Sequence, residues 1–302
     1  SFAERGVAVL RLDAVGYVVK RAGTNCFMVE PEIWEVLDWM RATADSLGMA
    51  VLPEVHDRYA THEKLAARGF LTYDFALPAL LLHTSETGDL TRLAAHLARS
   101  PRAQITMLDC HDGIPLLPDL EGFLSDDEMR ALANLAVRRG GNINRLLAKG
   151  RAAGAVDAHQ LNLTYYSAVG EDDERYLAVR AIQLFARGTP QVYYVGLLAG
   201  SNDLATVART GEGRSINRHD YAPDEIERAL ERPVVRQLLD LIRLRNTHPA
   251  FDGDLEVRAD GGRLRMRWAS GADACELTVD PRSGAHLVSA TGPAGAWRRS
   301  VA

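Results

Sequence analysis

Short apolar runs alternate with helical segments along most of this chain, and this alternation constrains its fold more than any other feature. Because the runs are apolar on both faces, they are typical of strands in a parallel sheet that is covered on both sides. Strands that alternate with helices predict βαβ units and an α/β fold. The predicted strands span residues 6–13, 48–54, 70–77, 104–109 and 191–196. The predicted helices span residues 32–47, 62–68, 90–99, 173–186 and 231–246.

The periodicity changes in two parts of the chain. Over about residues 113–165 the strand signal is weak, and we expect an inserted loop region that contains helices. After Pro249, polar and apolar residues alternate between glycine-rich turns, which predicts a small antiparallel β domain. We therefore expect two domains: a parallel α/β part over residues 1–249 and the β domain over residues 250–302.

The charge, the apolar runs and the cysteines exclude several classes of protein. A net charge of -5 over 302 residues, from 35 basic and 40 acidic side chains, provides no broad basic field for a nucleic-acid backbone. No apolar run approaches the roughly 18–20 residues that span a bilayer, and the first residues do not resemble a signal peptide. The three cysteines are scattered, so they fit neither a disulfide framework nor a zinc cluster. We expect a reducing, cytoplasmic location, with neither nucleic acid nor a membrane as partner.

Carboxylates stand at or near the ends of three predicted strands. They are Asp13, Glu54 and Asp109, with Asp112 just beyond the last. In parallel α/β barrels the active site forms at this end of the strands. A single carboxylate there is more often a helix cap or an ion-pair partner, but three at converging strand ends favour a site. Retaining glycosidases use two carboxyl groups about 5–5.5 Å apart, and neighbouring strands, about 4.7–4.9 Å apart, can supply that separation.

The first two of these carboxylates have different surroundings. Arg11 lies two residues before Asp13 on the same strand face, so its charge would keep Asp13 ionised, as a nucleophile requires. Glu54 lies in the apolar segment 52–55, a setting that raises the pKa of a carboxyl group and suits an acid. These surroundings suit Asp13 to the role of a nucleophile and Glu54 to that of a proton donor.

Five segments carry a resemblance to a known family. Residues 11–17, 53–56 and 108–114 resemble the motifs of the fourth, fifth and seventh barrel strands in the sucrose phosphorylase group of the α-amylase superfamily (glycoside hydrolase family thirteen). Residues 191–200 and 213–219 resemble narrower stretches that are particular to the phosphorylases, which include sucrose 6F-phosphate phosphorylase. The resemblance implies a (β/α)8 TIM barrel, of which we find only strands four to eight, followed by a small antiparallel β domain.

The resemblance also implies roles for individual residues. Asp13 would form a β-glucosyl-enzyme, Glu54 would be the acid/base, and Asp112 would stabilise the transition state. Substrate-binding roles are implied for Arg11, Tyr17, His56, His111, Gln160 and Arg214.

The loop at residues 156–160 departs from the pattern of the sucrose-specific members. His159 stands where they have tyrosine, which favours a phosphorylated or acidic α-glucoside, because a histidine can be a cationic donor near neutral pH. The alternative is that His159 is a solvated loop residue with no part in binding.

We therefore expect a hexosyltransferase, a retaining α-glucoside phosphorylase. It would transfer glucose from sucrose or sucrose 6F-phosphate to inorganic phosphate through a covalent glucosyl-enzyme and give α-glucose 1-phosphate, with no metal or organic cofactor. The alternatives are a glucosylglycerate-type phosphorylase, an α-glucoside hydrolase, a transglucosidase, or an inactive fragment or non-catalytic sugar-binding protein. Homodimerisation is left open. Because three barrel strands have no counterpart, we expect a fragment of a longer active parent, whose unpaired edge at residues 7–12 promotes association.

Overall fold

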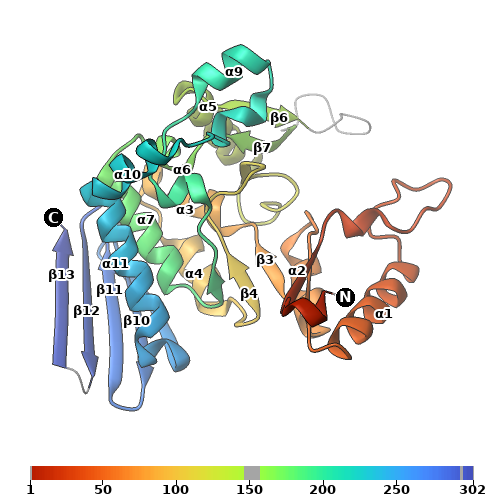
Figure 1. The fold of residues 1–302 in the computed structure, drawn as a ribbon, viewed down its shortest axis with the longest axis horizontal. Helices are drawn as coiled ribbons and strands as arrows, with labels where there is room; N and C mark the ends of the chain where they lie inside the picture. The colour runs from red at the N-terminus through yellow and green to blue at the C-terminus, as the bar shows by residue number, and fades with distance from the viewer. Residues whose placement is uncertain (1, 146–156, 293–294, 302) are drawn as a thin grey trace.

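The computed structural model describes residues 2–145, 157–292 and 295–301 (Figure 1). Its framework is a row of five parallel strands. Strand β1 pairs with β2, and β4 pairs with both β3 and β8. The amide of Leu71 donates to Val51 O at 3.1 Å and joins the two groups in the order β1-β2-β3-β4-β8. The strands are β1 (Val9–Leu12), β2 (Ala50–Pro53), β3 (Thr72–Asp74), β4 (Gln104–Thr106) and β8 (Thr189–Pro190).

Helices connect successive strands, because parallel pairing requires a crossover between one strand and the next. Helix α1 buries Ile33 and Leu37 against β1 and β2 in a core of its own. Leu65 of α2 belongs to the same small core, whereas α3, α4, α6 and α7 contribute to a larger core that continues into the C-terminal sheet. The crossover helices are α1 (Glu32–Asp45), α2 (Tyr59–Ala67), α3 (Leu77–Thr87), α4 (Thr91–Arg99), α6 (Tyr165–Ala168) and α7 (Asp173–Phe185).

The region between β4 and α7 carries the expected helix and also a small antiparallel sheet. Helix α5 (Asp126–Arg138) begins with a capping box between Ser125 and Glu128. The sheet has the order β5-β7-β6, and its strands are β5 (Ile114–Pro115), β6 (Asn142–Arg145) and β7 (Ala158–Asn162). These strands are too short to produce a clear alternation in the sequence, so the prediction missed them. Residues 146–156 of the predicted insertion, including Val156, lie outside the described residues.

After β8 the chain forms helices and then an antiparallel sheet of the order β13-β12-β11-β10-β9. The helical elements are α8 (Tyr194–Leu197), α9 (Leu204–Thr210), η3 (Gly213–Asn217), α10 (Pro223–Glu231) and α11 (Pro233–Thr247). The strands are β9 (Asp254–Asp260), β10 (Arg263–Ser270), β11 (Asp273–Val279), β12 (His286–Gly292) and β13 (Gly295–Val301).

The C-terminal sheet packs against the crossover helices through its apolar face. Along β10 the buried residues Leu264, Met266 and Trp268 alternate with exposed arginines, as the sequence pattern predicted. The indole of Trp268 donates to Phe185 O at 2.7 Å and so joins the sheet to the end of α7. The predicted β domain is present, and the boundary at residue 249 stays a prediction because one core runs through both parts.

The predicted strand at residues 191–196 is wrong. The chain pairs with β4 only as far as the bond from Gln191 N to Thr106 O, and it then turns into the short helix α8. A short run that is apolar in sequence has no periodicity that separates a strand from a helix. For the same reason helix α3, in which Leu77–Ser85 are all buried, was not predicted, and the predicted strand at residues 70–77 runs past the end of β3 to the first residue of this helix.

Among residues 2–145, 157–292 and 295–301, no helix combines the length and the hydropathy that a bilayer span requires.

Candidate active site

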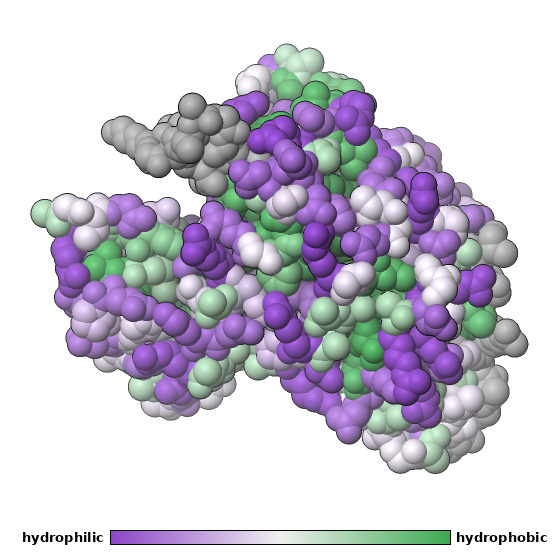
Figure 2. Space-filling view, turned by 180° about the vertical axis from the view of Figure 1, so that it is seen from behind, coloured by the Kyte–Doolittle hydropathy of each residue, from purple (hydrophilic) through white to green (hydrophobic). Residues whose placement is uncertain are grey.

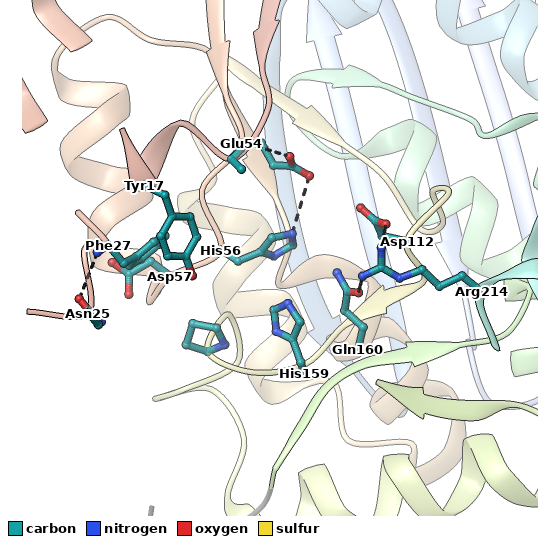
Figure 3. Close-up of a pocket in the computed structure, with 12 residues that line it drawn as sticks. Tyr17, Asn25, Phe27, Glu54, His56, Asp57, Asp112, His159, Gln160 and Arg214 are labelled. Carbon is teal, nitrogen blue, oxygen red and sulfur yellow. Dashed lines mark hydrogen bonds and ion pairs between the residues drawn. The ribbon is translucent and has the colours of Figure 1, made fainter. Parts of the chain in front are cut away.

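A cavity of about 470 Å³ opens at the carboxyl ends of the parallel strands. Its walls come from the segments that follow β1, β2 and β4, together with β7 and η3. Seen from behind, a hollow separates the part that carries β1 and α1 from the rest of the molecule (Figure 2). Figure 3 shows Glu54 and His56 on one side of the cavity, with Asp112 and Arg214 opposite them. The cavity therefore collects side chains from segments that lie far apart in the sequence.

Arg11 joins the two carboxylates that were predicted to act together. Its Nη1 donates to Asp13 Oδ1 at 3.0 Å, and its Nη2 lies 2.6 Å from Glu54 Oε1. Parallel pairing places Arg11 opposite Leu52, two residues before Glu54. The Glu54 side chain is 12% exposed and that of Asp13 is 77% exposed, so one guanidinium holds a sheltered and an open carboxyl group side by side.

The pKa values of these two carboxyl groups are shifted in opposite directions. The hydrogen bond with Glu54, followed by the hydrogen bond and the charge of Arg11, lowers the pKa of Asp13. Burial raises the pKa of Glu54, and the bond with Asp13 adds to that rise, although the charge of Arg11 opposes it. Asp13 is therefore held as a carboxylate while Glu54 is favoured as the protonated partner.

The turn after β1 places the aromatic wall of the cavity. Ala14 has a φ of 45°, in the left-handed region, and its amide donates to Glu54 Oε2 at 3.4 Å. A Cβ at Gly16 would lie 2.7 Å from the Phe27 ring, so the glycine allows that ring to approach. Phe27 in turn packs on Tyr17 with ring centroids 4.9 Å apart. The predicted aromatic residue Tyr17 thus lines the cavity with a partner that the sequence analysis did not identify.

Asp112 lies opposite Glu54 and is held by basic side chains. Arg214 Nη1 is 2.9 Å from Asp112 Oδ1, and Arg218 Nη2 is 3.5 Å from the same oxygen. His111 Nε2 lies 3.3 Å from Asp112 Oδ2. Arg218 also donates to His111 O at 2.7 Å, so it fixes the backbone of the motif as well as its carboxylate. The sequence analysis missed Arg218, although it stands in the same segment as Arg214.

Strand β7 brings Gln160 and His159 to the cavity. Gln160 Oε1 lies 3.5 Å from donors on Asn144 and Arg214, and the side chain is buried. His159 Nδ1 lies 2.5 Å from Leu117 O. Because a carbonyl oxygen can only accept, Nδ1 carries the proton and Nε2 of the neutral ring is an acceptor. Burial lowers the pKa of His159, and the nearby His56 and Arg214 lower it further against the opposing bond to Leu117.

The comparisons with known proteins agree on one group of enzymes. No family model matches the chain. A sucrose 6(F)-phosphate phosphorylase from Thermoanaerobacterium thermosaccharolyticum is 47% identical over 284 residues, which are 93% of this chain and 58% of that protein. A sucrose phosphorylase from Agrobacterium vitis is 45% identical over 298 residues, 96% of this chain and 61% of that protein. A glucosylglycerol phosphorylase from Marinobacter adhaerens is 44% identical over 279 residues, 91% of this chain and 58% of that protein.

A solved structure decides the fold. The crystal structure of sucrose 6F-phosphate phosphorylase from Thermoanaerobacter thermosaccharolyticum matches with a TM-score of 0.96 at 44% identity, and the match covers 99% of this chain and 62% of that one. The chain is homologous to sucrose phosphorylases and sucrose 6F-phosphate phosphorylases. It spans about three fifths of the length of these phosphorylases. The five parallel strands are part of a (β/α)8 barrel, as predicted.

The predicted site residues of this phosphorylase homologue fall into three groups. Seven of them line the larger cavity: Tyr17, Glu54, His56, Asp112, His159, Gln160 and Arg214. Arg11 and His111 line an adjoining cavity of about 250 Å³, to which Glu54 also belongs. Asp13 lines neither, and its exposed side chain reaches the site through Arg11 and Glu54.

Two other strand-end carboxylates of the phosphorylase homologue point away from the cavity. Asp109 Oδ2 lies 2.6 Å from Arg180 Nη2, and both side chains are buried. Asp74, at the end of β3, accepts from His96 Nε2 at 2.8 Å and from Leu77 N at 3.1 Å. Both carboxylates therefore stabilise the barrel wall, and the expectation that Asp109 converges on the site is wrong.

The sequence analysis also missed Asp119. Its Oδ2 lies 3.0 Å from His56 Nδ1, and its Oδ1 lies 3.9 Å from His62 Nε2. The side chain is 1% exposed. The sequence feature that could have identified it is an acidic residue between apolar ones, with Leu117 and Pro118 before it and Leu120 after it. A buried carboxylate needs a partner, and the structure supplies that partner from inside the site.

Proposed function

We propose that the protein is a retaining α-glucoside phosphorylase that transfers glucose from sucrose or a phosphorylated sucrose to inorganic phosphate. The observation that carries the proposal is the pair of carboxyl groups joined by Arg11, of which one has a lowered and the other a raised pKa. This is the division of states that a nucleophile and a general acid require at the same pH. The names of the relatives favour phosphate as the acceptor.

The reaction proceeds in two displacements. In the first, Asp13 attacks the anomeric carbon, the glycosidic bond breaks, and the proton of Glu54 passes to the departing oxygen. In the second, a phosphate oxygen attacks the same carbon, the bond to Asp13 breaks, and the proton of the incoming phosphate passes to Glu54. Asp112 and Arg214 hold sugar hydroxyls on the opposite side of the cavity. Each displacement inverts the carbon, so the product keeps the α configuration.

The stereochemistry provides the direct test of this proposal. With sucrose and inorganic phosphate, we expect the complete protein to release α-glucose 1-phosphate as its first product. The measurement is proton NMR of the anomeric signal during the reaction. The β anomer as first product would contradict the covalent intermediate. Free glucose at the same rate with and without phosphate would instead indicate a hydrolase, and oligosaccharides a transglucosidase.

The acceptor side of the cavity favours an anionic substrate. His56 and His159 line the cavity on the side of Glu54, and Arg214 lines it as well. His56 has a raised pKa and Arg214 carries a fixed charge, whereas the lowered pKa of His159 keeps this ring neutral in the free site. A phosphate group beside His159 would raise its pKa, so binding takes up a proton. This supports sucrose 6F-phosphate over sucrose, and glucosylglycerol- or glucosylglycerate-type substrates are the second candidates.

His159→Tyr is expected to move the preference from sucrose 6F-phosphate towards sucrose. The change removes the hydrogen-bond donor that His159 becomes when the phosphate group binds. The loss of this bond should lower kcat/KM for the phosphorylated substrate by roughly one to two decades. In the unchanged protein that preference should fall as the pH rises, because the protonated ring loses its Nε2 proton and becomes neutral, and the variant should lack this dependence. The measurement is kcat/KM for both substrates over a pH series.

A matched control for this experiment is His83→Gln. His83 is another histidine whose pKa is lowered by burial, but it lies beside Glu128 and outside the cavity. It should leave the ratio of the two substrates unchanged. A clear preference for unphosphorylated sucrose with His159 intact would contradict the anionic-substrate assignment.

A further inference from the structure

The buried carboxylate of Asp119 has no role in the two displacements described above, yet it contacts the site directly. We propose that Asp119 is a positioning residue that holds the His56 ring with Nε2 turned to Glu54, as the hydrogen-bond donor that admits phosphate to the glucosyl-enzyme. This inference rests on the proposed function. It adds a residue that determines whether phosphate or water takes the glucosyl group.

The geometry fixes the His56 ring on three sides. Nδ1 lies 3.0 Å from Asp119 Oδ2, and Nε2 lies 4.0 Å from Glu54 Oε1. The ring stacks on Phe75 with centroids 4.1 Å apart and planes 22° apart. Because the carboxylate accepts the Nδ1 proton, a second proton can only be carried by Nε2, which faces the site (Figure 3).

The backbone ties Asp119 to the wall of the cavity. Leu116 N and Leu117 N donate to His159 O at 2.9 and 3.3 Å, and Leu120 N donates to Leu116 O at 2.9 Å. The Asp119 segment is therefore anchored to β7 and closes into a turn. These bonds hold the backbone on both sides of Asp119 in place relative to β7.

The charges around His56 favour the protonated ring. Burial, the largest single effect, lowers the pKa of His56, but the charge and the hydrogen bond of Asp119, together with the charges of Glu54 and Asp112, outweigh it and raise the pKa overall. In return, His56 lowers the pKa of Asp119 against the effect of burial. Among the described residues, the titratable side chains that act on the ring, besides Asp119, or on the Asp119 carboxylate are Glu54, His62, Asp112 and His159.

A cation at His56 has a specific use in the second displacement. Once Glu54 has given its proton to the leaving group, it is a carboxylate. An incoming phosphate anion is then repelled by the negative charge of Glu54, whereas a neutral water molecule is not. An imidazolium between the two offsets that repulsion for phosphate alone. Loss of the Asp119 carboxylate should therefore lower the rate of phosphorolysis more than the rate of hydrolysis.

The test compares Asp119→Asn with the unchanged complete protein, using sucrose as donor and inorganic phosphate as acceptor. We expect the ratio of α-glucose 1-phosphate to glucose released at neutral pH to fall about tenfold or more, mainly through a higher KM for phosphate. Nitrogen-15 NMR of the imidazole should show the pKa of His56 falling below its ordinary value. An unchanged His56 pKa or an unchanged product ratio would overturn the proposal.

Two further variants separate positioning from general damage. Asp74→Asn changes another buried carboxylate that pairs with a histidine, His96, away from the cavity, and it should leave the product ratio unchanged. In a His56→Gln background, Asp119→Asn should have no further effect on the ratio, because it acts through His56. An equal effect in both backgrounds would contradict that route. If the unchanged protein gave no α-glucose 1-phosphate, the proposed function would fail, while the NMR titration would still test the pairing.

Discussion

Asp13→Asn is expected to lower turnover in the complete protein on the order of 10⁴-fold or more, because an amide cannot attack the anomeric carbon. Folding should be unaffected, since the side chain is 77% exposed and the amide has nearly the same shape. Arg11 keeps its contact with Glu54 in the variant. The measurement is the rate of sucrose phosphorolysis, with the thermal melt as a check on folding.

The control and a companion variant make this result specific. Asp45→Asn changes an exposed carboxylate that also pairs with an arginine, Arg41 at 2.7 Å, and it should leave turnover unchanged. Glu54→Gln should be severe with sucrose, but it should be partly spared with donors whose leaving group needs no proton. Such donors should not rescue Asp13→Asn. Near-normal turnover of sucrose and of sucrose 6F-phosphate by Asp13→Asn would remove Asp13 from the mechanism.

Asp109→Ala is expected to lower the free energy of unfolding by about 3–5 kcal/mol, because it leaves the Arg180 charge buried without its partner. Arg180 is fully buried, and its remaining bonds go to Tyr176 and Gln183. Gly196, in the segment that resembled a phosphorylase motif, lies against the same pair, and a Cβ there would collide with it. The measurement is urea denaturation of the variant and the unchanged chain.

An exposed ion pair of the same length provides the comparison. Asp224 pairs with Arg228 at 2.6 Å on the surface of α10, with both side chains largely exposed. Asp224→Ala should give no measurable change, because water screens such pairs. If Asp109→Ala were equally mild, the buried pair would not be holding β4 to α7.

Much of the architecture could be predicted because its cause is local. The strands, the crossover helices and the alternation along β10 follow from apolar periodicity, which depends on residues close in the sequence. The prediction failed where periodicity is lost, in the buried helix α3 and in the run that became α8. The segment at residues 146–156 lies outside the described residues, so the insertion is only partly tested.

The acidic residues at the carboxyl ends of the strands could be predicted from the sequence, because an apolar run that forms a strand ends at the first polar residue. The tertiary structure alone decided which of them serve the site. Asp109 meets Arg180, which is 71 residues away, and so belongs to the core, whereas Glu54 meets Arg11 and stays at the cavity. The charge of His56 likewise depends on Asp119, which is 63 residues away. Burial and charge act through space, so the pKa of a carboxyl group or an imidazole follows from neighbours that local sequence patterns do not reveal.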